Sequence, residues 1–151
     1  MTIEQKLAEL GLELPKATAP AANYVPVTRS GNLLFVSGQI SIGPDGITQG
    51  RLGDGMDVAA GQKAAELCAL NILGQVADNA SLDSVVQVLK LTVLVASSPD
   101  FNEQHLVANG ASDLLVKLLG EKGKHARAAF GVAALPRGAA VEIDAVIEIK
   151  P

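Results

Sequence analysis

The residue best placed to do chemistry in this chain is Arg127, a cation set among small and apolar neighbours. It lies in the segment 125–141, HARAAFGVAALPRGAAV, whose positions 126 and 128–132 hold only Ala, Phe, Gly and Val. A guanidinium in such surroundings needs a partner, either a carboxylate of the protein or a carboxylate or phosphate from outside. The first explanation predicts pairing across a hairpin with Glu142 or Asp144, and the second predicts an anion clamp in a pocket.

Other residue types give weaker indications of chemistry. His105 and His125 are the only histidines, and neither has a Cys, His or carboxylate at zinc-ligand spacing, so no metal site is predicted. Cys68 is the only cysteine. Its Ala- and Leu-rich helical context predicts a buried, unreactive thiol that forms no intrachain disulfide, which fits a reducing cytoplasm.

Hydrophobic periodicity and turn residues predict the elements that position Arg127. In chain order they are a hairpin with strands over 24–28 and 33–40, a helix over 57–78, a strand over 85–95, a helix over 98–119, and a final hairpin around the turn 135–138. Asp57 is predicted at the start of the first helix, and Ser98 with Pro99 at the start of the second. Alternation in the strand predicts one apolar face, made of Leu89, Leu91, Val93 and Val95.

These elements predict an α+β fold in which a mixed sheet is covered on one face by two helices. The chain has 151 residues and 48% hydrophobic content, which suffices for one domain over 21–151, preceded by a short helix and linker over 1–20. The other sheet face is predicted to be partly polar yet apolar enough to be a subunit contact, so we expect an oligomer. The alternative is a monomer whose second sheet face is solvated.

Composition excludes several classes of function. The formal net charge of −4 and the lack of a basic stripe argue against nucleic-acid binding. Aromatic residues make up only 3% of the chain, which leaves few platforms for stacking on bases or sugars. No segment approaches the roughly 20 apolar residues that a membrane span needs, and residues 1–15 lack signal-peptide character. We therefore expect a soluble protein of the cytoplasm.

Five segments are informative because of the order in which they occur. They are Asn23-Tyr24-Val25, the sequence LFVSGQI at 34–40, the strand 88–95 followed by Pro99-Asp100-Phe101, Asn109 within a helix, and Ala126-Arg127 followed by VAALP at 132–136 and VEIDA at 141–145. In this combination the chain resembles the RidA/YjgF imine-deaminase family over about residues 22–150.

The resemblance implies a chorismate-mutase-like fold assembled as a homotrimer, with clefts between the subunits. It also implies hydrolysis of 2-imino or 2-enamino acids to 2-keto acids and ammonia, without a metal or an organic cofactor. In this family the arginine at the position of Arg127 holds the substrate carboxylate through a two-pronged, charge-assisted contact. Glu142 stands at the family's acidic position, where it would hold or activate the attacking water.

The resemblance also assigns supporting positions around the substrate. Tyr24 would close the cleft, Ser37 and Gly38 would shape its wall, and Asn109 would approach from a helix. Ala129 stands where the best-known deaminases carry cysteine. Taken singly, Tyr24 also fits a strand aromatic, Ser37-Gly38 a β-bulge, and Asn109 a polar residue on an exposed helix face.

Two further hypotheses stand beside the imine deaminase. The first is a non-catalytic protein that binds a small carboxylate metabolite through the same Arg127. The second is a ribonuclease, an activity sometimes attached by name to this family. The acidic net charge and the lack of a His or Lys pair near Arg127 count against the ribonuclease.

Overall fold

A five-stranded mixed sheet is the frame of the computed structural model, which describes residues 1–17 and 23–151. Its strands are β1 (Val27–Ser30), β2 (Leu33–Ile40), β7 (Val85–Ala96), β8 (Ala126–Val132) and β9 (Val141–Ile149), in the spatial order β1-β2-β9-β7-β8. Only β7 and β8 run parallel; the other neighbours are antiparallel.

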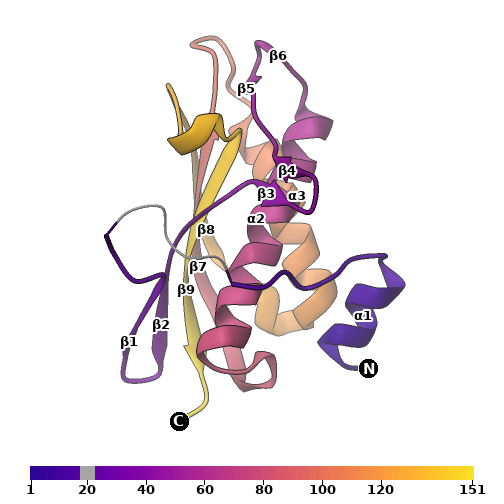
Figure 1. Ribbon diagram of the computed structural model, residues 1–151, viewed down its shortest axis with the longest axis vertical. Coiled ribbons are helices and arrows are strands. Elements are labelled where there is room, and N and C mark those ends of the chain that lie inside the picture. Colours follow the sequence, from indigo (N-terminus) through magenta and orange to yellow (C-terminus); the bar gives the residue numbers. More distant parts are fainter. Residues whose placement is uncertain (18–22) are drawn as a thin grey trace.

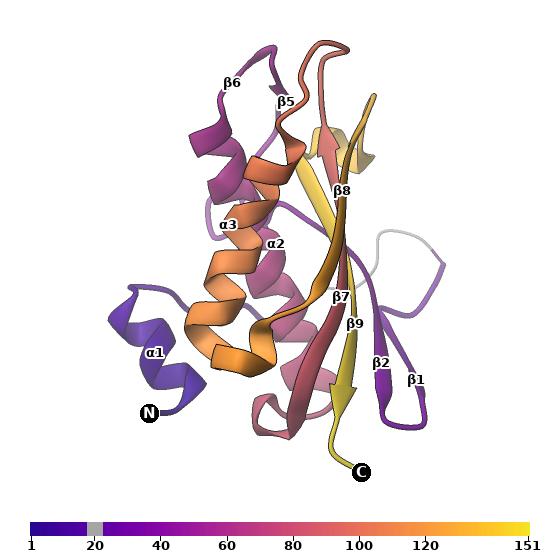
Figure 2. The same cartoon turned by 180° about the vertical axis from the view of Figure 1, so that it is seen from behind.

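Two long helices, α2 (Val58–Asn79) and α3 (Gln104–Leu119), lie on the same side of the sheet (Figures 1 and 2). We call this side the covered face and the opposite side the open face. In β9 the residues facing the helices are all buried and those facing the other way are half-buried, in strict alternation. The predicted α+β fold, with two helices on one face of a mixed sheet, is confirmed.

Smaller elements complete the described chain. They are α1 (Ile3–Glu9), the two-residue strands β3 (Ile42–Gly43), β4 (Gly46–Ile47), β5 (Arg51–Leu52) and β6 (Gly55–Met56), and three short 3-10 turns, Leu82–Ser84, Gly120–Gly123 and Pro136–Gly138. Helix α1 packs against α3 on the side away from the sheet (Figure 1). Lys6 Nζ donates to the carbonyl of Leu118 at 3.3 Å. Residues 18–22, which include the end of the predicted linker and the start of the predicted domain, lie outside the described residues.

Two predictions that rest on local signals are confirmed. Strands β1 and β2 form an antiparallel hairpin closed by a tight turn at residues 31 and 32, although β1 covers Val27–Ser30 and not the predicted 24–28. Helix α2 begins after Asp57, whose side chain accepts a hydrogen bond from the amide of Ala60 at 2.9 Å. Such a cap satisfies one of the amides that a helix start leaves unpaired.

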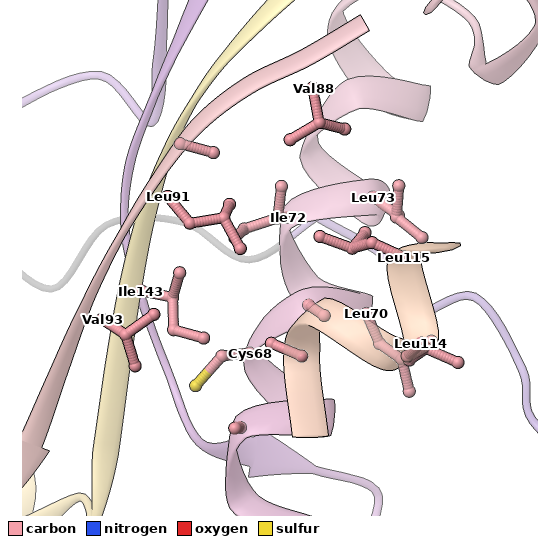
Figure 3. Packing of buried hydrophobic residues seen from close by; sticks show 14 of the residues in the cluster. Cys68, Leu70, Ile72, Leu73, Val88, Leu91, Val93, Leu114, Leu115 and Ile143 are labelled. Carbon is pink, nitrogen blue, oxygen red and sulfur yellow. The ribbon is translucent and has the colours of Figure 1, made fainter. Parts of the chain in front are cut away.

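The core fills the space between the two long helices and the covered face (Figure 3). Helix α2 contributes Cys68 and Ile72 there, and Leu91, Val93 and Ile143 of the sheet meet it with no exposed surface. Cys68 lies within this layer, is fully buried, and has its Sγ 3.4 Å from the carbonyl oxygen of Val141. The predicted buried thiol is therefore confirmed.

The predicted start of the second helix is wrong. Helix α3 begins at Gln104 instead of at Ser98. The amide of Ser98 donates to the carbonyl of Leu52 at 2.8 Å, and the amide of Phe101 donates to the carbonyl of Ser98 at 3.1 Å. The first bond holds Ser98 beside β5, and the second closes a turn, so residues 98–101 are not helical. Phe101 packs against the core before the helix begins in sequence.

The predicted apolar face of strand β7 needs one correction. Register shifts between Val88 and Lys90 in the pairing with β9. Val88 is consequently buried, whereas Leu89 is 37% exposed. Leu91 and Val93 remain on the covered face as predicted, because strict alternation resumes after the irregularity.

The predicted final hairpin is also wrong. Strand β8 pairs with β7 at the edge of the sheet, and β9 lies between β2 and β7. The connection over 133–140 is longer than the about two to five residues of a hairpin loop, so the chain can pass over one strand before it pairs again. The amide of Gly50 donates to the carbonyl of Gly138 at 3.3 Å, and Gln49 Nε2 donates to that of Arg137 at 2.8 Å, which fixes this crossing.

In the part of the chain that the structure describes, none of the helices has the length and apolar character needed to cross a membrane.

Candidate functional site

Arg127 lies on the edge strand β8 and directs its guanidinium toward α3. Its Nη1 donates to Asn109 Oδ1 at 2.9 Å and to Ser112 Oγ at 3.1 Å, and its Nη2 donates to the carbonyl of His105 at 3.1 Å. The three acceptors are four and three positions apart in sequence, so they lie on one face of the helix. Helix α3 therefore holds the arginine from successive turns.

No carboxylate among residues 1–17 and 23–151 pairs with the charge of Arg127. Between the described residues the structure has one ion pair, Lys124 with Glu121 at 2.7 Å. All three groups that accept from Arg127 are neutral. A guanidinium has five N–H donors, so Nε–H and one Nη2–H remain without a protein partner among the described residues. The predicted pairing of Arg127 with Glu142 or Asp144 is wrong, because β8 and β9 are not neighbours.

A second hydrogen-bonded chain continues behind Arg127. Ser112 Oγ lies 2.8 Å from His125 Nε2, and His125 Nδ1 lies 2.6 Å from the carbonyl oxygen of Gly123. Sequence reasoning did not select Ser112 or assign His125 a role. The available signal was spacing, because Ser112 is about one helical turn beyond Asn109 and His125 is two residues before Arg127, just ahead of β8. Together, Arg127, Asn109, Ser112, His125 and the His105 carbonyl form what we call the Arg127 cluster.

Glu142 lies on the open face, next to a β-bulge in β2. The register between β2 and β9 shifts between Val36 and Gln39, which leaves Ser37 and Gly38 as the bulged residues. A Cβ atom at Gly38 would lie 2.5 Å from Glu142 Oε2, so only glycine allows the carboxyl group to lie against this backbone. The structure thus brings Ser37, Gly38 and Glu142 together, and we call them, with Asp144, the Glu142 cluster.

The acids of the Glu142 cluster are harder to ionise than free carboxyl groups. Burial raises the pKa of Glu142 from its ordinary value, and the nearby charge of Asp144 raises it further. Burial also raises the pKa of Asp144, opposed by a hydrogen bond from Thr92 and by the charge of Lys90. A carboxyl group whose pKa lies closer to neutrality is better suited to exchange protons with a substrate.

The structure does not bring the two clusters together in a single chain. Glu142 is opposite Leu94 in the pairing of β9 with β7, and Leu94 is opposite Phe130 in the pairing of β7 with β8. Directly paired residues share a face, and Phe130 is three positions beyond Arg127, so Arg127 and Glu142 project from opposite faces.

The remaining predicted site residues are more scattered. Tyr24 lies in the segment leading into β1 and is 48% exposed. Ala129 is two positions beyond Arg127 on the covered face and packs against the core. Asn109 does not lie free on an exposed helix face, because its side chain accepts from Arg127.

Comparison with known proteins shows the relationships of the chain. The sequence model of the family described as Endoribonuclease L-PSP matches residues 14–149. The chain belongs to the RidA/YjgF family. Protein TCP17 of Trypanosoma cruzi is 50% identical over 153 residues, covering 98% of this chain and 94% of that one. The 2-iminobutanoate/2-iminopropanoate deaminase of Mus musculus is a more distant relative, 34% identical over 132 residues, covering 87% of this chain and 83% of the mouse protein.

Solved structures of RidA/YjgF proteins agree with the fold. Protein Atu1372 of Agrobacterium tumefaciens, of unknown function, is 56% identical and superposes with a TM-score of 0.91 over 98% of this chain and 92% of its own. RidA from an Antarctic Psychrobacter species is 30% identical, with a TM-score of 0.62 over 89% of this chain and 94% of its own. The superposition with Atu1372 therefore extends over nearly the whole chain.

Two other observations concern the cysteine and the potential metal ligands of this RidA/YjgF chain. Burial raises the pKa of the Cys68 thiol well above its ordinary value, and the charge of Glu142 raises it further. A neutral, fully buried thiol cannot serve as a nucleophile. No group of three His, Cys, Asp or Glu side chains in residues 1–17 and 23–151 is arranged to hold a metal ion.

Proposed function

We propose that this protein hydrolyses reactive 2-imino or 2-enamino acids to 2-keto acids and ammonia, with the substrate carboxylate bound by Arg127. One observation carries the proposal. Arg127 is held by three neutral acceptors, has no carboxylate partner in the described chain, and keeps two N–H donors. A related protein carries the name 2-iminobutanoate/2-iminopropanoate deaminase, which supports this substrate class.

The proposed hydrolysis needs the protein mainly to bind and orient the substrate. Water adds to the carbon of the C=N bond, the nitrogen takes up protons, and the tetrahedral adduct collapses to a C=O bond and ammonia. A planar guanidinium fixes the carboxylate next to the reacting carbon at two points, which a lysine cannot do. Because the imine is already reactive, modest help from binding and orientation suffices.

Glu142 is proposed to hold the attacking water and take its proton. The raised pKa of this carboxyl group supports that role, because a base of intermediate strength can also return the proton to the leaving nitrogen. Ser37 and Gly38 would form the wall beside it, Tyr24 would close the entrance, and Asn109 would hold Arg127. Proton transfer by a carboxyl group leaves no step that requires a metal or an organic cofactor.

We also propose that the protein acts as a homotrimer whose clefts lie between subunits, in the cytoplasm. Arg127 and Glu142 project from opposite faces of one sheet, so a cleft that uses both needs residues of two copies. The open face supports a subunit contact, since Phe35 and Phe130 are 42% and 48% exposed there.

A second candidate function is a non-catalytic binder of small carboxylates. The residue that favours it is Ala129, which occupies the place of the cysteine of the best-known deaminases beside the same Arg127. In this case Arg127 would hold the metabolite, and hydrolysis would be absent.

The test generates 2-iminobutanoate in solution with an amino-acid oxidase and follows its decay with and without the protein. We expect the wild type to accelerate decay and Arg127→Ala to abolish the acceleration. Arg29→Ala is the matched control, because Arg29 is an exposed arginine of β1 whose Nε donates to the carbonyl of nearby Gly31. Binding of 2-oxobutanoate without any acceleration would favour the non-catalytic binder.

A further inference from the structure

Ser112 and His125 form a hydrogen-bonded chain that ends on the Arg127 guanidinium. From Arg127 Nη1 it passes to Ser112 Oγ at 3.1 Å, from Ser112 Oγ to His125 Nε2 at 2.8 Å, and from His125 Nδ1 to the carbonyl of Gly123 at 2.6 Å. These hydrogen bonds join α3, the residue just before β8, and the 3-10 turn over Gly120–Gly123. They therefore link three elements behind the proposed carboxylate site.

The chemistry of the partners fixes the direction of each bond. A carbonyl oxygen only accepts, so His125 Nδ1 carries the hydrogen that lies between them. In a neutral imidazole Nε2 is then the acceptor, and the Ser112 hydroxyl must donate to it. Donation turns the lone pairs of Ser112 Oγ toward Arg127 Nη1.

The last acceptor in the chain is itself held in place. A Cβ atom at Gly123 would overlap the backbone carbonyl of Leu115, so glycine is required for the 3-10 turn to lie this close to α3. The close approach directs the carbonyl of Gly123 at His125 Nδ1. The orientation of the imidazole is therefore set by backbone, and the orientation of the Ser112 hydroxyl is set by the imidazole.

We infer that Ser112 and His125 are positioning residues that fix the guanidinium of Arg127 for its carboxylate ligand. The inference rests on the proposed function for the identity of that ligand. Asn109 and Ser112 together occupy both hydrogens of Nη1, so the guanidinium plane cannot turn without breaking one of these bonds. Neither Ser112 nor His125 touches the substrate, and both act through Arg127.

The kinetic test compares Ser112→Ala and Ser112→Thr with the wild type in 2-iminobutanoate hydrolysis. Loss of an orienting bond should raise KM about tenfold in Ser112→Ala while kcat stays within about twofold. Ser112→Thr keeps the hydroxyl and should return KM to within about threefold of wild type. Ser30→Ala, an exposed serine of β1, is the matched control. An unchanged KM in Ser112→Ala, or a threonine variant as weak as the alanine variant, would overturn the inference.

Nuclear magnetic resonance tests the same inference without any substrate. The ring nitrogens of His125 should show the tautomer protonated at Nδ1, and the ¹⁵N–¹H Overhauser effect of Arg127 Nε should report a rigid side chain in the wild type and in Ser112→Thr. In Ser112→Ala this rigidity should be lost. A tautomer protonated at Nε2, or equal rigidity in Ser112→Ala, would refute the positioning role. If the wild type hydrolyses no imine but these signals behave as expected, the proposed function fails and the positioning role stands.

Discussion

The two faces of the sheet carry charged side chains of opposite sign in different surroundings. At the edge of the covered face, the cation Arg127 is surrounded by neutral acceptors and keeps donors to spare. On the open face, burial raises the pKa of both Glu142 and Asp144, and the charge of Asp144 raises that of Glu142 further. In the proposed function, the Arg127 cluster receives an anion and the Glu142 cluster exchanges a proton. Because the two clusters lie on opposite faces of one sheet, that proposal requires residues of two copies of the chain.

The largest expected effect is a loss of stability on the covered face that is much smaller for the matching substitution at the exposed Leu89. Leu91 is fully buried beneath the helices, whereas Leu89 is 37% exposed. Leu91→Ala should lower the free energy of unfolding by about 3 kcal/mol, since it removes packed methyl groups and leaves a cavity. Leu89→Ala should cost less than about 1 kcal/mol. Chemical denaturation measures both, and equal losses would mean that Leu89 is covered in the assembled protein.

The next effect concerns the proton-transfer half of the site. Glu142→Gln keeps the shape of the side chain but cannot take a proton, so kcat for imine hydrolysis should fall about 100-fold with KM nearly unchanged. Steady-state kinetics with Glu148→Gln as control tests this, because Glu148 lies on the same face of the same strand. A loss confined to KM would assign Glu142 to substrate binding instead.

The anion-binding half should respond differently. Arg127→Lys keeps the charge but loses the planar pair of donors, so KM should rise about tenfold with a smaller change in kcat. Arg127→Ala, which loses the charge as well, should bind the carboxylate more weakly still. Calorimetric binding of 2-oxobutanoate gives the same ranking without catalysis. Equal affinity for all three proteins would remove Arg127 from the site.

The smallest expected effect is a pH-dependent stability difference at Glu142. Its pKa is raised in the fold above the ordinary value of 4.5, mainly by burial and then by Asp144. Below the ordinary pKa the carboxyl group is protonated in both the folded and the unfolded state, so the raised pKa does not change the free energy of unfolding. As pH rises through the ordinary value and then the raised value, the unfolded chain ionises first and the fold is weakened. At pH 7 Glu142→Gln should therefore be more stable than wild type by less than about 1 kcal/mol, a gain that vanishes near pH 4. Thermal unfolding measured across this range tests it.

Features set by neighbouring residues could be predicted from the sequence. The cap at Asp57 and the turn between β1 and β2 are local, and both are observed where expected. The start of α3 could not be predicted, because the amide of Ser98 bonds to Leu52, which is distant in sequence. The shift near Leu89 belongs to the pairing of two strands and leaves no trace in either strand alone.

The candidate site divides in the same way. Arg127 stands out in the sequence because its neighbours are apolar, and this makes it a candidate on its own. Its partners could not be assigned, because the separation of β8 from β9 depends on which strand each finds in the folded sheet. Ser112 and His125 have ordinary sequence contexts, and only the packing of α3 on β8 gives them a role.

The most direct test of the account mixes two inactive variants. Arg127→Ala and Glu142→Gln are unfolded together, refolded as mixed oligomers, and assayed for 2-iminobutanoate hydrolysis, with mass spectrometry to verify mixing. If each cleft takes Arg127 from one copy and Glu142 from another, random mixing leaves about a quarter of the clefts with both residues intact, and activity should return to about that fraction of wild type. If mixed oligomers form and no activity returns, the two clusters do not meet between copies, and the account is contradicted.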